Sequence, residues 1–284
     1  MPDFSKILLT VDFDRTLTGP DSKIPERNIE AIRYFMDNGG TFTVNTGRST
    51  TTFAPYLETL PRNAPLLLYN GSAAYDKGEL MDVRQIDLDP LQVIADMRRL
   101  FPEANLELQG ADNHYLIEPT PNAEAYYKGM NWGYAIFDEN TPLYPFMKFC
   151  LFGQPKKFAV SDLFDGTEEE LRYFEEATAT IAKMYEGKVE VMLAAPRILD
   201  VQAIGVSKCA AARNLQKKLG EEILVCVGDA HNDIAMLDGA DYAFCPADAI
   251  VADRYETVCE CGKGAIADVI YEKIPMICEI SLDS

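Results

Sequence analysis

The segment Lys6–Leu17, KILLTVDFDRTL, joins an apolar run to a cluster of polar side chains. Its first half, Lys6–Val11, is nearly continuous in apolar residues, as in strands that are buried on both faces of a sheet. The second half contains Asp12, Asp14 and Thr16. In open α/β sheets the active site lies beyond the carboxyl ends of the strands, so these polar residues stand where functional groups are expected.

The residues that follow alternate between helix and strand signals. Pro25 to Gly40 predicts a helix that begins at a proline and ends at two glycines. Thr41–Val44 predicts a second strand, and Pro65–Tyr69 predicts a third buried strand that is closed by a turn. This order predicts a parallel sheet with crossover helices. The second strand runs into Thr46-Gly47-Arg48, which is a second polar group at the carboxyl edge.

The middle of the chain has another pattern. Helices are predicted over residues 90–101 and 167–184, and Thr167–Glu170 has the spacing of a capping box at the start of the second one. Strands are expected between them, and residues 119–146, with four prolines and many aromatics, look rich in loops. We interpret residues 84–196 as an inserted α+β domain.

The core pattern returns after the insertion. Ile198–Val201 is interpreted as a short core strand, and Ser207 is expected to cap a helix that runs to about Leu219. Glu222–Val227 is a strongly apolar strand that ends in Gly228-Asp229. The chain is expected to finish with a helix from Asn232, a strand at Tyr242–Phe244 and a helix near 264–273. The predicted fold class is therefore α/β: a Rossmann-like parallel-sheet core, 1–83 and 197–284, with an inserted α+β domain.

The composition excludes several classes of partner. The chain has 284 residues, is 48% hydrophobic and has a formal net charge of −19, so it would repel nucleic acid. It lacks both a long apolar run and a recognisable secretory signal, and we expect a cytoplasmic protein, monomer or homodimer, without a membrane partner. Its seven cysteines are an odd number and are expected to be reduced thiols.

The polar groups at the strand ends suit phosphoryl transfer. Mg²⁺ prefers oxygen ligands, which Asp12 and Asp229 can offer from two strand ends. A carboxylate can attack phosphorus, and a second one, Asp14, can protonate the leaving group and then deprotonate water. Thr46 can donate a hydrogen bond to the phosphoryl oxygens, and Lys208 can supply a positive charge.

Four segments in this order resemble the four motifs of the haloacid dehalogenase (HAD) superfamily. They are Asp12–Leu17 (DFDRTL), Thr46-Gly47-Arg48, Lys208, and Gly228–Asp233 (GDAHND). The insertion between the second and third motifs resembles the type IIB (C2B-type) cap of Cof-like phosphatases. Motifs of this kind are hypotheses that gain weight from their context, and all four stand at strand ends or helix starts.

The resemblance implies a role for each residue. Asp12 is the nucleophile, and Asp14 is the general acid and base. Mg²⁺ is bound by Asp12, by the backbone carbonyl of Asp14 and by Asp229, while Asp233 supports the metal site directly or through water. The phosphoryl group of the substrate is bound by Thr46, Gly47, Arg48, Lys208 and Asn232. An aspartate at position 14 favours a phosphatase or mutase over an ATPase.

The resemblance leaves alternatives open. The first hypothesis is a phosphatase acting on a small phosphorylated metabolite, with a sugar phosphate as the favoured class; a phosphomutase or a ligand-sensing protein without catalysis is the alternative. Arg48 is either a phosphate ligand or a surface charge. His114 and the cap aromatics line a substrate face or pack within the cap. The chain also departs from the family pattern at Arg15, where glycine is usual, at Ala230-His231 and at Asp248.

Overall fold

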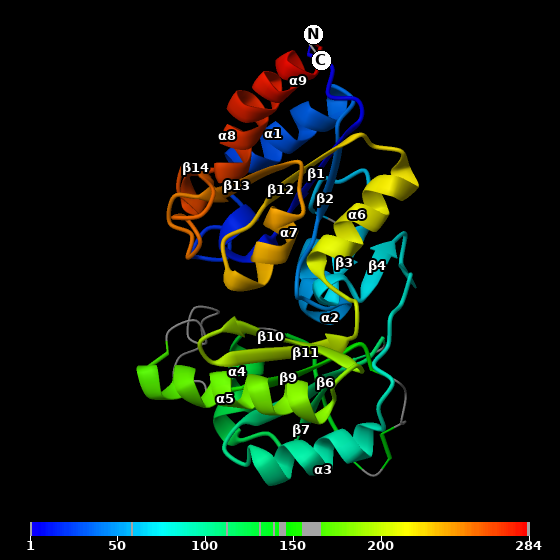
Figure 1. Cartoon of the computed structure of the whole chain (residues 1–284), viewed down its shortest axis with the longest axis vertical. Coiled ribbons are helices and arrows are strands. Elements are labelled where there is room, and N and C mark those ends of the chain that lie inside the picture. Colours follow the sequence, from blue (N-terminus) through cyan, green and yellow to red (C-terminus); the bar gives the residue numbers. More distant parts are fainter. Residues whose placement is uncertain are drawn as a thin grey trace. The chain divides into compact units, whose positions relative to one another are not determined.

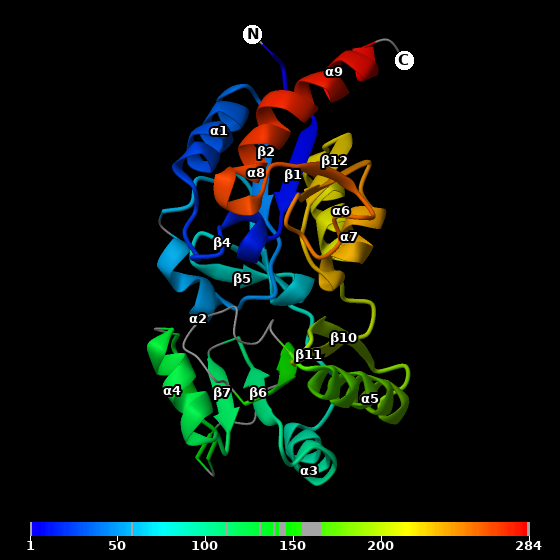
Figure 2. The ribbon, with the colours of Figure 1, turned by 90° about the vertical axis from the view of Figure 1, so that its left-hand side faces the viewer.

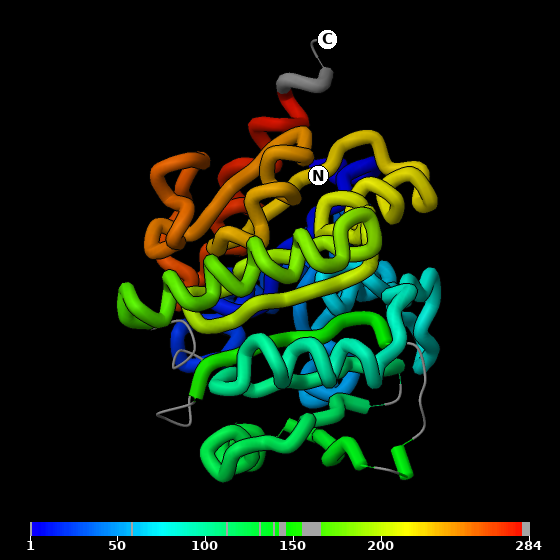
Figure 3. The backbone as a smooth tube through the Cα atoms, turned by 60° about the horizontal axis from the view of Figure 1, so that its bottom comes forward, coloured from blue at the N-terminus to red at the C-terminus, as the bar shows by residue number. Residues whose placement is uncertain are grey.

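A computed structural model describes residues 2–57, 59–111, 113–130, 132–138, 140–141, 146–154 and 166–282. The chain forms two compact units. The first consists of Met1–Gly47, Pro55–Glu79 and Ser207–Ser284, and the second of Arg48–Ala54 and Leu80–Val206. In Figure 3 the green part of the tube belongs to the second unit, and the orange-to-red part belongs to the first.

The first unit is built on a five-stranded sheet with the order β14-β13-β12-β1-β2. Every neighbouring pair in this sheet is parallel, which confirms the predicted architecture. The strands are β1 (Ile7–Val11), β2 (Thr41–Val44), β12 (Ile223–Val227), β13 (Tyr242–Pro246) and β14 (Glu256–Val258). The two central strands, β1 and β12, are the longest apolar runs of the unit, as burial on both faces requires.

Helices cover both faces of this sheet, with α1, α8 and α9 on one side and α6 and α7 on the other (Figure 2). Their bounds are α1 (Glu26–Asp37), α6 (Lys208–Leu219), α7 (Ile234–Asp238), α8 (Ala265–Asp268) and α9 (Ile274–Leu282). Leu8 and Cys226 of the sheet pack against Ala212 and Leu215 of α6 and Met236 of α7. Alternate residues of each strand therefore pack against the helices on opposite faces of the sheet. For this reason β1 and β12 carry no polar side chain except Thr10.

The third predicted strand does not extend the parallel sheet as a regular member. It is β3 (Leu66–Leu68), which pairs antiparallel with β4 (Ala73–Asp76) in a three-stranded sheet that also contains β5 (Glu79–Met81). An isolated parallel bridge between Asn45 and Leu67 is what links it to the end of β2. The hairpin follows from Asn70-Gly71, because both residues have positive φ and reverse the chain there.

The second unit is built on a six-stranded sheet with the order β10-β11-β9-β6-β7-β8 (Figure 1). Helices α3 and α5 pack on one face, and α4 lies on the opposite side (Figure 2). The strands are β6 (Asn105–Gln109), β7 (His114–Ile117), β8 (Ala135–Ile136), β9 (Lys148–Phe152), β10 (Val189–Ala195) and β11 (Ile198–Ala203). The helices are α2 (Thr50–Phe53), α3 (Pro90–Leu100), α4 (Pro121–Gly129) and α5 (Glu168–Met184).

Two sequence interpretations in this region are wrong. The stretch that looked like loop contains α4, in which Thr120 caps the helix and Pro121 occupies its first turn, a position where proline is compatible with a helix. Ile198–Val201 is not a core strand; it belongs to β11, which pairs with β9 and β10. A short apolar strand has the same pattern in either sheet, so the sequence did not distinguish them. The unit boundary accordingly falls after Val206. The other proline-rich part of the predicted loop, Pro142–Pro145, lies outside the described residues.

The cap aromatics pack with one another. Tyr127 contacts Trp132, Tyr134 and Phe152 with ring centroids 5.6–6.1 Å apart, and Tyr126 contacts Trp132 at 5.8 Å. These rings form a cluster of their own that joins α4 to the sheet. Among the described helices, none has the length and apolar character that crossing a bilayer would require.

Candidate active site

The carboxyl ends of three strands meet at one edge of the parallel sheet. Val11 of β1 is in register with Val227 of β12 and with Val44 of β2. The backbone N–H of Asp12 donates to the carbonyl of Val227 (2.8 Å), and the N–H of Asn45 donates to that of Val11 (2.8 Å). The residues after each strand are therefore brought together by the sheet itself.

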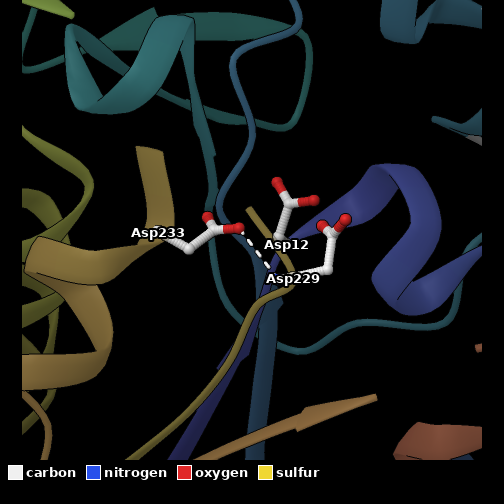
Figure 4. Close-up of side chains that lie close together, drawn as sticks. All are labelled: Asp12, Asp229 and Asp233. Atoms are coloured by element: carbon white, nitrogen blue, oxygen red, sulfur yellow. Dashed lines mark hydrogen bonds between the residues drawn. The ribbon is translucent and has the colours of Figure 1, made fainter. Parts of the chain in front are cut away.

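Three aspartates form an acidic cluster at this edge (Figure 4). Asp12 follows β1, Asp229 follows β12, and Asp233 comes from the short 3-10 turn His231–Asp233. One carboxylate oxygen of each lies within 4.8 Å of the others, and all three residues are buried. Figure 4 shows the three carboxyl groups gathered above the strand ends. Residues more than 200 positions apart thus form one site.

Lys208 supplies the positive charge of the site. It is the first residue of α6, which Ser207 caps by accepting a hydrogen bond from the N–H of Ala210 (3.0 Å). Its Nζ lies 2.5 Å from Asp12 Oδ1 and 2.7 Å from Asp233 Oδ1, and its side chain is fully buried. The Asn45 side chain also donates to the carbonyl of Lys208 (2.8 Å) and fixes the start of the helix. Lys208 is therefore held by two carboxylates and by the backbone.

Both carboxylate oxygens of Asp233 accept hydrogen bonds from neighbouring groups. Its Oδ1 accepts from Lys208, while its Oδ2 accepts from the backbone N–H groups of Asp229 (3.0 Å) and Ala230 (3.1 Å). The dashed line in Figure 4 marks the contact with Asp229. Gly228 permits this arrangement, since a Cβ at that position would lie 2.6 Å from the Cβ of Asp233. Asp233 thus orients Lys208 and the loop that carries Asp229.

Asp12 and Asp229 each retain one carboxylate oxygen for another partner. Asp12 Oδ1 accepts from Lys208, and Asp229 Oδ1 accepts from the Thr16 hydroxyl (3.0 Å). Within the described residues, neither Asp12 Oδ2 nor Asp229 Oδ2 has a hydrogen-bond donor. Sequence reasoning did not assign Thr16 or Asn45 to the site. Thr16 stands in the same motif as Asp12, so its place in a short loop beside the acidic residues was the available signal.

Burial dominates the electrostatics of the site. It raises the pKa of Asp12 to about 7; Lys208 opposes this rise, while the nearby Asp233 and Asp14 add to it. Burial and the neighbouring Asp12 also raise the pKa of Asp229 well above its ordinary value. Burial opposes the charge on Lys208, but the carboxylates of Asp12 and Asp233 outweigh it, so the pKa of Lys208 is raised. The positive charge of Lys208 therefore does not fully balance the negative charge of the neighbouring carboxylates.

The excess of negative charge at the site suits the binding of a divalent cation. Three carboxylates face one ammonium group, so the fully ionised cluster has two negative charges in excess. Asp12 Oδ2 and Asp229 Oδ2 are oxygen donors of the kind that Mg²⁺ prefers, and it usually binds one or two carboxylates together with water and phosphate. Asp233, whose oxygens already accept three hydrogen bonds, suits an indirect role.

Four other predicted site residues also follow strands of the parallel sheet. Asp14 is half-buried in the loop after β1, and Asn232 is half-buried beside Asp233. Thr46 is buried, and its carbonyl accepts from the N–H of Asn70 (2.9 Å). A Cβ at Gly47 would lie 2.8 Å from Oδ1 of the same asparagine, so any other residue here would have to displace the Asn70 side chain.

Arg48 belongs to the second unit and has partners there. Its Nη1 donates to the carbonyl of Thr52 (3.1 Å), and its guanidinium lies 5.5 Å from the centre of the Trp132 ring. His231 is exposed. These contacts do not test the predicted contact of Arg48 with phosphate, which stays a prediction. The acidic cluster and Lys208, in contrast, lie together.

The first unit is an α/β domain with a parallel sheet, an α+β unit is inserted into its chain, and an acidic site lies at the carboxyl ends of its strands. A sequence model of the haloacid dehalogenase-like hydrolases matches residues 9–252, so the chain belongs to that family. The match contains every residue of the acidic cluster and all of the second unit.

Named relatives agree with this assignment. The chain is 26% identical over 236 residues to a 5-amino-6-(5-phospho-D-ribitylamino)uracil phosphatase of Bacillus subtilis, a match that covers 82% of this chain and 80% of the relative. It is 24% identical over 253 residues to an HMP-PP phosphatase of Escherichia coli, covering 88% and 87%. An uncharacterized hydrolase of Schizosaccharomyces pombe is 25% identical over 251 residues, covering 83% and 79%. The family match makes the chain a member of a hydrolase family, and two of these relatives are named as phosphatases.

Solved structures show the same fold. A subclass IIB sugar phosphatase of the HAD superfamily superposes with a TM-score of 0.74 at 18% identity, covering 94% of this chain and 99% of the other. A HAD/Cof-like hydrolase from Plasmodium vivax gives a TM-score of 0.74 at 22% identity, covering 99% and 97%. The predicted resemblance to Cof-like proteins with a type IIB cap is thereby confirmed for the fold.

Proposed function

We propose that the protein is a Mg²⁺-dependent phosphatase that hydrolyses a small phosphorylated metabolite through an aspartyl-phosphate on Asp12. The observation that carries this proposal is the buried set of Asp12, Lys208, Asp229 and Asp233 at one sheet edge. An acidic cluster of this charge needs a cation, and a carboxylate beside a lysine is suited to attack on an anionic phosphoryl group.

The first half of the reaction forms a bond between an Asp12 carboxylate oxygen and phosphorus. The bond from phosphorus to the leaving-group oxygen breaks, and the carboxyl group of Asp14 gives its proton to that oxygen. Lys208 stabilises the negative charge on the phosphoryl oxygens while it keeps Asp12 oriented. Its rigid attachment to Asp233 means that little reorganisation is needed during the step.

The second half releases the phosphate. The Asp14 carboxylate takes a proton from water, the water oxygen attacks phosphorus, and the bond from phosphorus to Asp12 breaks. Inorganic phosphate leaves, and Asp12 and Asp14 return to their starting protonation states. Asp14 suits this exchange of protons because it is half-buried, in contrast to the buried Asp12.

Asp12, Asp229 and the backbone carbonyl of Asp14 would hold Mg²⁺, with Asp233 supporting them indirectly. When bound, the ion neutralises the phosphate and the attacking carboxylate, so that the two anions can approach. Thr46, Gly47 and Asn232 are proposed to bind the phosphoryl oxygens. The named phosphatases among the relatives support a small phosphorylated substrate, of which sugar phosphates are one class.

Phosphate release tests the proposal. Native protein and Asp12→Asn are assayed with p-nitrophenyl phosphate and a set of sugar phosphates, with Mg²⁺ and after chelation. We expect release by the native protein that requires Mg²⁺ and that is absent in Asp12→Asn. Rearrangement of a sugar phosphate without release would indicate a mutase, and an Asp12→Asn protein equal to the native one in every assay would exclude the proposed mechanism.

A further inference from the structure

Arg15 lies in the middle of the loop that carries the proposed catalytic groups. It follows Asp14 directly, and the hydroxyl of the next residue, Thr16, donates to Asp229 Oδ1 (3.0 Å). The backbone N–H of Arg15 donates to the hydroxyl of the buried Thr18 (3.2 Å). The loop is therefore fixed on the C-terminal side of Arg15, and its backbone is held beside the acidic cluster.

The backbone at Arg15 has a conformation that side chains disfavour. Its φ of +59° and ψ of +12° lie in the left-handed region, which glycine adopts without cost. Glycine is usual at this position of the family motif, so the loop does not need a side chain here. Strained residues gather at functional sites, and an arginine at this position therefore indicates a use for its guanidinium group.

The guanidinium group of Arg15 has no counter-charge in the part of the chain that the structure describes. The residue is half-buried, yet no described carboxylate lies within 4.0 Å of it. Other cations in neighbouring segments of this unit are each paired with a carboxylate. These pairs are Lys23–Asp21 (3.6 Å), Arg27–Asp268 (2.6 Å) and Lys263–Glu260 (3.1 Å). The charge of Arg15 is thus left for another partner.

The loop of Arg15 packs beside the turn Cys261–Lys263. The two segments approach closely, because a Cβ at Gly19 would lie 3.2 Å from the Cα of Gly262. Burial raises the pKa of the Cys261 thiol to about 12, and the positive charge of Arg15 opposes this rise. The guanidinium group therefore lies on the side of the loop that faces this turn.

Asp248 holds the same turn next to the loop that carries Asp229. Its Oδ1 accepts from the N–H of Cys261 (2.9 Å), and its Oδ2 accepts from the thiol of that cysteine (3.2 Å). Two residues further on, the N–H of Ile250 donates to the carbonyl of Asp229 (2.9 Å). Arg15 and Asp229 thus belong to connected loops at the carboxyl edge of the sheet, and Asp248 uses its oxygens for the turn.

Charge indicates what Arg15 could bind. The chain has a net charge of −19, and the ionised acidic cluster has two negative charges in excess of Lys208. A substrate with a second anionic group is repelled by this field unless a further cation offsets it. Lys208 is held by two carboxylates, whereas Arg15 offers a planar set of donors that matches a phosphate or a carboxylate.

We propose that Arg15 is a specificity-determining residue whose guanidinium group binds a second anionic group of the substrate, separate from the phosphoryl group that is removed. The inference rests on the proposed function and narrows its substrates to phosphorylated compounds with two anionic groups. The second group is a carboxylate or a further phosphoryl group, because both offer the oxygen pair that a guanidinium group binds.

Matched pairs of substrates measure the preference for a second anion. Glycerol 3-phosphate is compared with 3-phosphoglycerate, glucose 6-phosphate with glucose 1,6-bisphosphate, and adenosine 5′-monophosphate with the 5′-diphosphate. The first pair tests a carboxylate, and the other two test a phosphoryl group. The preference is the ratio of kcat/KM for the compound with two anionic groups to kcat/KM for its partner.

Three variants test the role of the side chain. Arg15→Met removes the charge, and Arg15→Lys keeps the charge without the planar fork. Arg33→Met is the matched control, because Arg33 is exposed on α1 and also lacks an ion pair within the described residues. We expect the native protein to prefer the compound with two anionic groups in at least one pair. Arg15→Met should lower that preference about tenfold or more, mainly through KM, and Arg15→Lys should retain part of it. Arg33→Met should leave it unchanged.

Two further measurements keep this inference separate from the proposed function. Hydrolysis of p-nitrophenyl phosphate by the native protein shows whether it is a phosphatase at all. Calorimetry on Asp12→Asn, with and without Arg15→Met, measures binding of the same pairs without turnover. No release from p-nitrophenyl phosphate would contradict the proposed function. Release with a preference that does not depend on Arg15 would contradict only the present inference.

Thermal unfolding separates binding from a structural role. The midpoint of Arg15→Met is expected to equal that of the native protein, because the guanidinium group has no ion pair to lose among the described residues. The inference is wrong if the native protein shows no preference in any pair, or if the preference is the same in Arg15→Met. A lower midpoint with an unchanged preference would show that Arg15 stabilises the loop instead.

Discussion

The ammonium group of Lys208 lies 2.5 Å from a carboxylate oxygen of Asp12, although the two residues are 196 positions apart. The same ammonium group lies 2.7 Å from Asp233. One buried cation therefore links the end of β1, the start of α6 and the turn after β12.

Replacing Lys208 by methionine should destabilise the protein strongly. Lys208→Met keeps the length of the side chain but leaves Asp12 and Asp233 buried without their counter-charge. Removing one partner of a buried ion pair costs roughly 3–5 kcal/mol, and urea unfolding measures the loss. Lys6→Met is the matched control, because the Lys6–Glu222 pair has the same N–O distance but is mostly exposed. Equal stability of Lys208→Met and the native protein would contradict the role of Lys208.

Gly228→Ala should disturb the site without removing any functional group. The new Cβ would meet the Cβ of Asp233 at 2.6 Å and its carboxyl carbon at 2.7 Å, so Asp233 must move and Lys208 loses its orientation. Displacements of about 1 Å can cost about a hundredfold in rate, and we expect kcat to fall by that order. Gly262→Ala is the control, since its Cβ would meet Pro20 at an ordinary 3.4 Å. Full activity in Gly228→Ala would show that Asp233 is dispensable.

The loop after Asp12 contains a strained residue. Arg15 has φ +59° and ψ +12°, in the left-handed region that glycine adopts without cost, which explains why glycine is usual at this position of the family motif. Arg15→Gly is expected to raise the free energy of unfolding by up to about 1 kcal/mol in urea titrations. Arg15→Ala, which keeps a Cβ, should give no such gain. A loss of stability in the glycine variant would contradict this reading of the backbone.

Mg²⁺ should stabilise the protein more as the pH rises. Burial raises the pKa of Asp12 from 3.8 to about 7, so the folded, metal-free protein binds a proton there more tightly than the unfolded chain does. This contribution to stability is present in full below about pH 4 and is lost as the pH rises through 7. Mg²⁺ replaces the missing positive charge only when the carboxylate is ionised.

The increase in unfolding temperature on adding Mg²⁺ is therefore expected to be larger at pH 8 than at pH 5.5. Asp12→Asn serves as the control, because it has no proton to lose at this position, and its response should be smaller and should depend less on pH. A native response that decreases between pH 5.5 and pH 8 would contradict metal binding at Asp12.

The sequence predicted the core well where apolar runs ended in polar residues. The strands at Lys6–Val11 and Glu222–Val227 appear with bounds that differ by one residue, because a strand buried on both faces leaves an unmistakable pattern. Ile198–Val201 was assigned to the wrong sheet, since its pattern carries no information about its neighbours. The prolines of residues 119–146 predict loop, but Pro121 stands in the first turn of α4, where proline is compatible with a helix, and Thr120 caps that helix.

The polar partners were harder to predict than the acidic residues. Asp12 and Asp229 stand directly after strands, so the parallel sheet alone places them together. The hydrogen bond of Thr16 to Asp229 depends on the path of a loop whose Arg15 has an uncommon backbone conformation. The burial of Glu107 and Gln109 does not follow from the sequence, because alternating polar residues are normally the solvated side of a strand.

The central claim is that Asp12 forms a covalent bond to phosphorus, and trapping that bond tests it most directly. The protein is quenched in acid during turnover of p-nitrophenyl phosphate with Mg²⁺, reduced with borohydride, and examined by peptide mass spectrometry. An aspartyl-phosphate is reduced to homoserine, so we predict homoserine at position 12 in the native protein and none without substrate or in Asp12→Asn. Sustained phosphate release with no modification at position 12 and with full activity in Asp12→Asn would contradict the account.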